Sequence, residues 1–280
     1  MIQNPFLDPA RRTELYGHAT RLACRSNALM RAKTDGHPVP DTVVDLVLAH
    51  HPPATRLGVI VDVGCGRGTS TRTLAERLKP RRIVGLDAAE PLIRDARRRV
   101  GKVPGVQVSF HVGDFHQLPF PTRTCDLVVA AFCLYHSPHP ETAIAEISRV
   151  LAPDGLAVLV TKSLDSYREM DSLVAEAGLD PQAERRESLY TAAHSGNLPA
   201  LAATGLDLVT VAEELHHFTF DGHDHVAEYL ATNPKYEFSP GLPSNPGELA
   251  QALHRSLPDR PFTTSSLITY VVGQPRGGNS

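Results

Sequence analysis

The sequence lacks three features: an excess of basic residues, a long apolar run and a pair of closely spaced cysteines. Its 28 lysines and arginines stand against 31 acidic residues, so it has no basic field that could hold nucleic acid by counterion release. No apolar stretch reaches the roughly 18 residues that cross a bilayer. Cys24, Cys65, Cys125 and Cys133 form no C-x-x-C pair, and the first residues lack a basic region followed by an apolar run. We therefore expect a cytoplasmic protein with reduced thiols and no nucleic-acid or membrane partner.

Short valine-rich runs alternate with stretches of helical periodicity in the middle of the chain. The composition, 41% hydrophobic and 21% charged, is that of a folded globular protein. The runs lie at residues 58–64, 81–87, 106–114, 125–135 and 155–162. Strands that alternate with helices predict a parallel sheet with right-handed crossovers, and nearly continuous apolar runs indicate helices on both faces. Two further strands, expected at 206–220 and 266–273, would close the sheet as an antiparallel pair.

Helical patterns and irregular segments suggest how the rest of the chain is organised. Residues 9–33 and 41–50 have helical spacing, so we expect an N-terminal helical cap over residues 1–57 and one main domain over residues 58–280. Two segments of that domain, about 179–205 and 222–262, interrupt the regular alternation and are expected to be inserted as a lid. The side chains in them that could close over a substrate are Tyr190, His194, Tyr229, Lys235 and Tyr236.

A glycine-rich loop follows the first valine-rich run. Asp62 precedes Gly64, Gly66 and Gly68, and Asp87 ends the second run about 20 residues further on, where an acidic side chain can meet a ribose diol. The glycines let the backbone turn sharply and approach a ligand closely. A nicotinamide or flavin dinucleotide site would need its third glycine at position 69, where this chain has threonine. A carboxylate at the loop entrance would also repel a pyrophosphate, so the loop favours a ligand with cationic groups.

Over residues 58–162 the chain resembles the class I S-adenosylmethionine (SAM)-dependent methyltransferases. The similarity is strongest to the small-molecule group that includes ubiquinone and menaquinone methyltransferases and bacterial natural-product methyltransferases. Besides the loop and the acidic end of the second run, the segments 113–120, 125–129 and 151–155 match. The resemblance implies an α/β fold with a Rossmann-like, seven-stranded, mostly parallel sheet and helices on both faces, to which the cap and lid are added. It also implies that SAM is the cofactor.

The resemblance implies a set of cofactor-binding residues. Asp87 would bind the ribose hydroxyls and Ala88 would contact the adenine. Asp114 would accept a hydrogen bond from the adenine amino group, and Phe115 would pack on the ring. The loop residues that would lie beneath the methionine part of SAM are Asp62, Gly64, Cys65, Gly66 and Gly68.

Residues from two other places complete the expected site. Ala131 and Phe132, at the end of the fourth run, would contact SAM through their backbone carbonyls. Tyr16 and Arg25 lie on the N-terminal helix, which often caps SAM in this family, so either could reach its carboxylate. Methyl transfer mostly requires alignment of the acceptor, with a base where the acceptor holds a proton. The residues best placed for these catalytic tasks follow the fourth run, and they are Tyr135 and His136; the alternative is that they only shape the pocket wall.

Histidine pairs elsewhere in the chain do not predict a metal site. His216 and His217 lie in a strand-like run, so their side chains would point to opposite faces. His223 and His225 are closer to a ligand pair, but no third ligand stands at a recognisable spacing. We therefore expect no bound metal.

The sequence predicts an enzyme that transfers the methyl group of SAM to a small metabolite in specialised, natural-product metabolism, as a monomer or homodimer. Two other functions stay open. SAM-dependent chemistry of another kind, such as aminocarboxypropyl transfer or cyclisation, would use the same motif, and so would a non-catalytic SAM-binding protein. The motif indicates SAM, but it identifies neither the acceptor nor the carbon that is attacked.

Overall fold

The computed structural model describes residues 4–51, 56–239 and 244–277, and the chain divides into two compact units. Unit 1 consists of the residues up to Gly36, Ser163–Thr191 and Glu214–Leu267. Unit 2 consists of His37–Lys162, Ala192–Glu213 and the residues from Ile268 on. None of the helices in the described ranges combines the length and the apolar character needed to span a bilayer.

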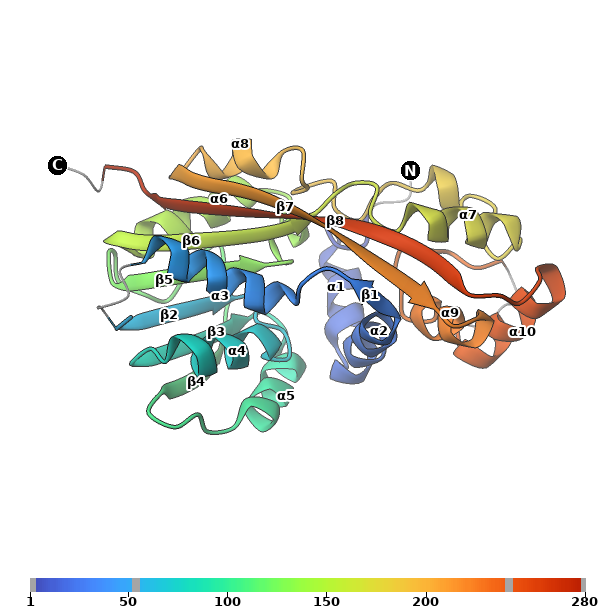
Figure 1. Ribbon diagram of the computed structural model, residues 1–280, viewed down its shortest axis with the longest axis horizontal. Helices are drawn as coiled ribbons and strands as arrows, with labels where there is room; N and C mark the ends of the chain where they lie inside the picture. Colours follow the sequence, from blue (N-terminus) through green and yellow to red (C-terminus); the bar gives the residue numbers. More distant parts are fainter. Residues whose placement is uncertain (1–3, 52–55, 240–243, 278–280) are drawn as a thin grey trace. The chain divides into compact units, whose positions relative to one another are not determined.

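The described residues form one sheet of eight strands in the order β1-β7-β8-β6-β5-β2-β3-β4 (Figure 1). Strands β2 to β6 pair in parallel, whereas β8 is antiparallel to β6 and β1 is antiparallel to β7. The strand bounds are Lys33–Asp35 for β1, Val59–Val63 for β2, Arg82–Asp87 for β3, Gln107–Val112 for β4, Cys125–Ala131 for β5, Leu151–Lys162 for β6, Leu206–Phe220 for β7 and Phe262–Pro275 for β8. The expected mostly parallel α/β fold is confirmed, with β1 as one strand more than the seven expected.

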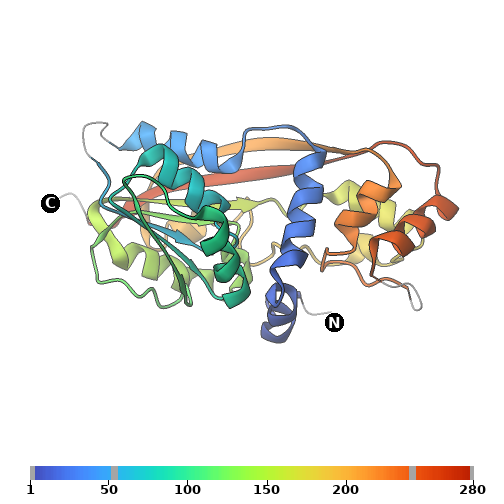
Figure 2. The ribbon, with the colours of Figure 1, turned by 90° about the horizontal axis from the view of Figure 1, so that it is seen from below.

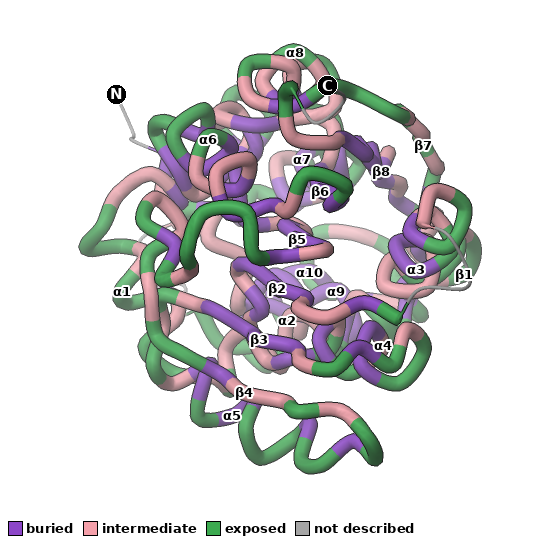
Figure 3. The backbone as a smooth tube through the Cα atoms, turned by 90° about the vertical axis from the view of Figure 1, so that its left-hand side faces the viewer, coloured by how far each residue is buried: buried purple, intermediate pink, exposed green. Residues whose placement is uncertain are grey.

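Helices cover both faces of the sheet in unit 2. Figure 2 shows α3 and α4 side by side, and Figure 3 shows the buried strands β2 and β5 with α3 and α4 to one side and α6 to the other. The helices are amphipathic, which lets them cover the sheet, and α5 is an example. It buries Leu92, Ile93 and Ala96 in the core and exposes its arginines. The bounds are Val39–His50 for α3, Thr69–Leu78 for α4, Glu90–Val100 for α5, Pro140–Val150 for α6 and Leu198–Ala202 for α8.

Helix α3 belongs to unit 2 and not to the N-terminal cap that the sequence suggested. Val43, Val44 and Val47 are buried in the same core as Ile60 and Leu127 of the sheet. The chain therefore divides after Gly36, and the expected boundary at residue 57 differs from this division. The apolar face of α3 is the physical reason, since it packs on the sheet strands and on α4.

Unit 1 has a hydrophobic core of its own. Its helices are α1 (Pro9–Tyr16), α2 (Ala19–Ala32), α7 (Arg168–Glu176), α9 (His223–Leu230) and α10 (Pro246–Ser256). The core joins buried side chains of α2, α7, α9 and α10, and aromatic rings line it, such as Phe220 and Tyr229 with centroids 5.7 Å apart. The expected lid segment 222–262 therefore lies within a packed unit, whereas the segment 179–205 is shared between the two units. Their action as a lid stays a prediction.

Candidate functional site

Three positions of the loop between β2 and α4 have backbone conformations that favour glycine. Gly64, Gly66 and Gly68 have φ angles of +64°, +53° and +79°, which side chains rarely adopt. A Cβ on Gly64 would lie 2.4 Å from the Cβ of Cys133, and a Cβ on Gly68 would lie 2.6 Å from Val100. The loop is therefore tight against its own domain, and its backbone forms the surface beyond the end of β2.

The carboxylate of Asp87 ties this loop to the end of the neighbouring strand β3. The backbone N–H of Gly66 donates to Asp87 Oδ2, and that of Ala89 donates to Oδ1, each at 2.9 Å. Burial raises the pKa of Asp87 above the usual range of a carboxyl. Each carboxylate oxygen can accept more than one hydrogen bond. The side chain that the family resemblance assigns to a ribose is thus positioned by two backbone donors and retains acceptor capacity for hydroxyls.

Asp62 lies buried beneath the loop, with 1% of its surface exposed. Its Oδ2 accepts a hydrogen bond from the hydroxyl of Thr71, in the first turns of α4. Burial is the main cause that raises the pKa of Asp62 to about 7; the Thr71 hydrogen bond opposes this shift and the charge of Asp87 adds to it. The side chain joins the end of β2 to α4, and its expected attraction for a cationic ligand stays a prediction.

The two cysteines of the site are packing residues. Cys65 and Cys133 are buried, and burial raises the pKa of each thiol well above the usual value. The sulfur of Cys133 lies 3.4 Å from the carbonyl oxygen of Val63. Neither thiol is therefore activated as a nucleophile.

A chain of hydrogen bonds that the sequence did not suggest holds Asp114. Its Oδ1 accepts the backbone N–H of His116 at 2.9 Å and lies 2.6 Å from His116 Nδ1. The other ring nitrogen, Nε2, lies 2.7 Å from the hydroxyl oxygen of Ser137, which is fully buried and accepts the backbone N–H of His139. If Nδ1 of His116 donates a hydrogen bond to the Asp114 carboxylate, Nε2 can accept a hydrogen bond from the Ser137 hydroxyl. Asp114, the expected adenine-binding side chain, is thereby fixed in orientation.

Beyond β5 the backbone turns sharply at Phe132, which has a φ of +59°. Its N–H donates to the carbonyl of Val160, and Lys162 Nζ lies 5.1 Å from the centroid of its ring. The turn leads into a short 3₁₀ helix, η1 (Leu134–His136), which carries both expected catalytic residues. Tyr135 is buried, whereas His136 is half-buried with Nδ1 3.1 Å from the carbonyl of Cys133. Their catalytic roles stay predictions.

The structure also brings His194 to the carboxyl end of β6, within unit 2. The N–H of Ser195 donates to the carbonyl of Lys162, and the hydroxyl of Thr161 donates to the carbonyl of Ala193. His194 Nδ1 accepts the backbone N–H of Gly196 at 3.1 Å, and burial lowers the pKa of this histidine. A neutral His194 then carries its proton on Nε2. No spacing in the sequence links residue 194 to residue 162, since the intervening chain passes through unit 1.

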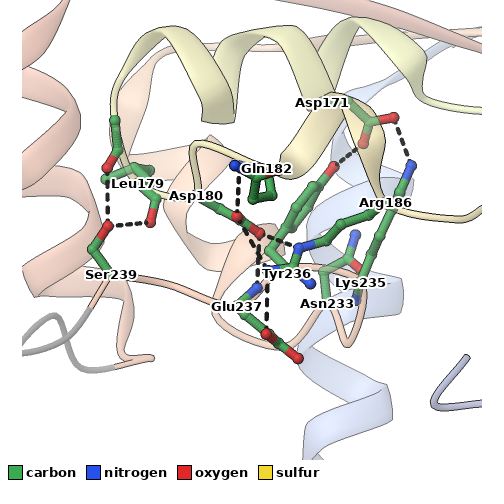
Figure 4. Close-up of polar contacts among 11 residues, drawn as sticks. Asp171, Leu179, Asp180, Gln182, Arg186, Asn233, Lys235, Tyr236, Glu237 and Ser239 are labelled. Atoms are coloured by element: carbon green, nitrogen blue, oxygen red, sulfur yellow. Dashed lines mark hydrogen bonds and ion pairs between the residues drawn. The ribbon is translucent and has the colours of Figure 1, made fainter. Parts of the chain in front are cut away.

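Ala88 and Ala131 lie in unit 2 with the glycine loop, whereas the remaining expected residues belong to unit 1. Arg25 Nη1 donates to the carbonyl of Thr232 at 3.3 Å. Figure 4 shows Lys235 and Tyr236 directed at Asp171, to which they donate at 2.6 and 2.9 Å. These two contacts anchor the segment after α9 to α7. Contacts with SAM or substrate stay predictions for the six expected residues of unit 1, which are Tyr16, Arg25, Tyr190, Tyr229, Lys235 and Tyr236.

Part of the chain is similar in sequence to known methyltransferases. Residues 60–155 match the family model described as a methyltransferase domain. The chain is 33% identical over 156 residues to a trans-aconitate 2-methyltransferase of Acidovorax sp. (strain JS42). This alignment covers 53% of this chain and 58% of that protein. It is 36% identical over 117 residues to a demethylmenaquinone methyltransferase of Thermus thermophilus, and this second alignment covers 42% of this chain and 50% of that protein. The chain thus spans about half the length of these curated relatives.

A solved structure from Bacillus halodurans C-125 shares the fold. It superposes with a TM-score of 0.54 and 18% sequence identity, covering 84% of this chain and 99% of the other. At this identity the likeness speaks for the fold alone. The family match is more specific, because it spans the glycine loop, Asp87, Asp114 and η1.

Proposed function

We propose that this chain is a class I SAM-dependent methyltransferase, because its residues 60–155 match the model of a methyltransferase domain, and that it transfers the methyl group of SAM to a small-molecule acceptor. One observation carries the proposal: within the matched domain, the Asp87 carboxylate is bonded to the backbone of the glycine loop. Asp87, the acid we propose for ribose binding, and the glycine loop therefore lie side by side beyond the ends of two adjacent parallel strands, and ligands bind at this edge in such sheets.

The residues present fit SAM better than a dinucleotide. Side chains at Gly64 and Gly68 would clash with Cys133 and Val100, so the loop keeps a bare backbone, and the carboxyl of Asp62 at the loop suits a positively charged ligand better than a pyrophosphate. Asp87 would accept hydrogen bonds from the ribose hydroxyls. Asp114, held by His116, would accept a hydrogen bond from the adenine amino group. When bound, SAM supplies a methyl group on a positively charged sulfur.

The chain's own residues would align the acceptor and manage its proton. His136 and Tyr135 on η1 and His194 beyond β6 are the polar side chains we propose for this task. A neutral His194 with its proton on Nε2 can donate a hydrogen bond to an acceptor oxygen, and His136 would take the proton of a hydroxyl or amine acceptor. The relatives named above for trans-aconitate and demethylmenaquinone support a small-molecule acceptor. Specialised metabolism is the setting we propose from the resemblance.

Product analysis tests the proposal. The purified chain would be incubated with SAM carrying a deuterated methyl group and a panel of small carboxylic acids, phenols and amines, and the products followed by mass spectrometry. We expect S-adenosylhomocysteine and one deuterated acceptor. Methylthioadenosine would indicate aminocarboxypropyl transfer in place of methyl transfer, and the absence of any calorimetric binding of S-adenosylhomocysteine would overturn the assignment of the cofactor as well.

A further inference from the structure

The histidine pair that the sequence brought to attention, His223 and His225, is separated in the structure. His225 Nε2 lies 2.8 Å from the carbonyl oxygen of Ala28, and its Nδ1 accepts the backbone N–H of Asp221. Its ring also packs edge-on against Phe220. His225 is therefore a buried residue with partners at both ring nitrogens, and it does not share a ligand with His223.

His223 instead meets two residues that lie far away in the sequence. Its Nδ1 lies 3.3 Å from Nδ1 of His254, on α10. Asp259, just beyond α10, faces both rings, with Oδ1 3.8 Å from His223 Nδ1 and Oδ2 3.7 Å from His254 Nδ1. In the part of the chain that the structure describes, these three residues are the one group of metal-ligating side chains whose ligand atoms all lie within 4.8 Å of one another.

Of the three pairs of facing ligand atoms, only the two Nδ1 atoms lie within hydrogen-bond distance of each other. The carboxylate lies too far from either ring nitrogen for a hydrogen bond, so direct hydrogen bonds do not account for the convergence of all three ligand atoms. A cation about 2.1 Å from both Nδ1 atoms would see them at an angle of about 105°, close to the tetrahedral value that zinc prefers. We propose that His223 Nδ1, His254 Nδ1 and an Asp259 carboxylate oxygen bind a divalent cation of the zinc type, with water as a further ligand.

The surroundings hold the three ligands in place. The backbone N–H of His223 donates to Asp259 Oδ1 at 2.9 Å, which orients the carboxylate. The exposed Asp224 faces the second ring nitrogen of His254 with Oδ1 at 3.8 Å, which is too long for a hydrogen bond. His223 is 3% exposed, so its ring is held within the packed unit. The site lies in unit 1, links α9 to α10, and does not depend on the proposed methyl transfer.

Zinc binding by the tag-free full chain tests this site. Zn²⁺ is titrated in competition with a chromophoric chelator, using the wild type and the variants His254→Gln and Asp259→Asn. Both replaced side chains are partly exposed, at 41% and 48%, and asparagine retains an oxygen for the His223 N–H, so both variants should fold; circular dichroism and metal-free melting check this. We expect one Zn²⁺ per chain, and a loss of affinity of at least about tenfold in each variant.

The control is His111→Gln, which removes an exposed histidine of β4. This variant should bind Zn²⁺ as the wild type does, and Zn²⁺ should raise the melting temperature of both. Co²⁺ in the wild type should give the strong visible absorption of a tetrahedral site. The proposal is overturned if His254→Gln and Asp259→Asn bind Zn²⁺ as tightly as the wild type, or if the wild type binds none.

Discussion

Replacing Asp62 by asparagine changes how stability depends on pH. The Asp62 side chain is 1% exposed and accepts a hydrogen bond from Thr71. Asparagine has the same shape and keeps an acceptor oxygen for the Thr71 hydroxyl, but it carries no charge. Any difference in pH dependence between the two proteins therefore reports on the ionisation of this one carboxyl.

The magnitude follows from the pKa of Asp62, which burial raises to about 7 from an ordinary 3.8. Between these two pH values the folded protein keeps a proton that the unfolded chain has lost, so the free energy of unfolding falls as the pH rises through this window. The full effect of about three pKa units corresponds to about 4 kcal/mol. Between pH 5 and pH 8 the Asp62 carboxyl should cost the wild type about 3 kcal/mol, and Asp62→Asn should lack this loss.

Urea unfolding of both proteins at pH 5 and pH 8 measures this difference. Titrating groups far from Asp62 are shared, so their contributions cancel in the comparison, whereas Asp87, whose charge acts on Asp62, contributes to the difference. The wild type should lose about 3 kcal/mol relative to Asp62→Asn, and saturating SAM should reduce the gap, because a cationic ligand favours the ionised carboxylate. Parallel stability profiles for the two proteins would refute the reasoning, since they would mean that the carboxyl titrates alike in the folded and unfolded chains.

Three further substitutions test the site and unit 1. Asp87→Asn should weaken SAM binding by about 10- to 100-fold in calorimetry, because hydrogen bonds to a charged acceptor contribute about 1.5–3 kcal/mol. Gly64→Ala should destabilise the protein by about 1–3 kcal/mol in urea unfolding, since the added Cβ would lie 2.4 Å from that of Cys133. Arg186→Met should cost about 3–5 kcal/mol by the same assay, because it leaves the carboxylate of Asp180, 2% exposed and bonded to Arg186 in Figure 4, buried without its partner.

Each of these variants has a matched control. Asp154→Asn changes an exposed acid of β6 in the same domain and should leave SAM affinity unchanged. Gly178→Ala has a similar positive φ of +68° but open space around it, so it separates backbone strain from steric clash. Arg185→Met removes an exposed arginine next to the buried one. Equal effects in any variant and its control would contradict the role given to the residue.

The valine-rich runs predicted strands β2 to β6 because nearly continuous apolar segments signal a sheet buried on both faces. Strand β1 escaped notice because Lys33–Asp35 is short and polar and is a strand only through its pairing with β7. Helix α3 was assigned to the cap because it precedes the first run, and only its buried contacts reveal that it packs on the sheet. Local periodicity predicts elements, but not which elements pack together.

The same limit explains which site residues were found. The glycine loop and Asp87 were predictable because a fixed spacing in a strand–loop–helix unit sets their geometry. The bond between His116 and Ser137 joins residues 21 positions apart, and that between His223 and His254 joins residues 31 apart. No periodicity relates such pairs, because the fold and not the local chain brings them together.

A crystal structure with S-adenosylhomocysteine bound tests the central claim most directly. We expect the amino-acid part of S-adenosylhomocysteine to lie along Gly64 to Gly68, and both of its ribose hydroxyls to donate hydrogen bonds to the carboxylate of Asp87. A ligand bound elsewhere, or one whose ribose does not touch Asp87, would contradict the account.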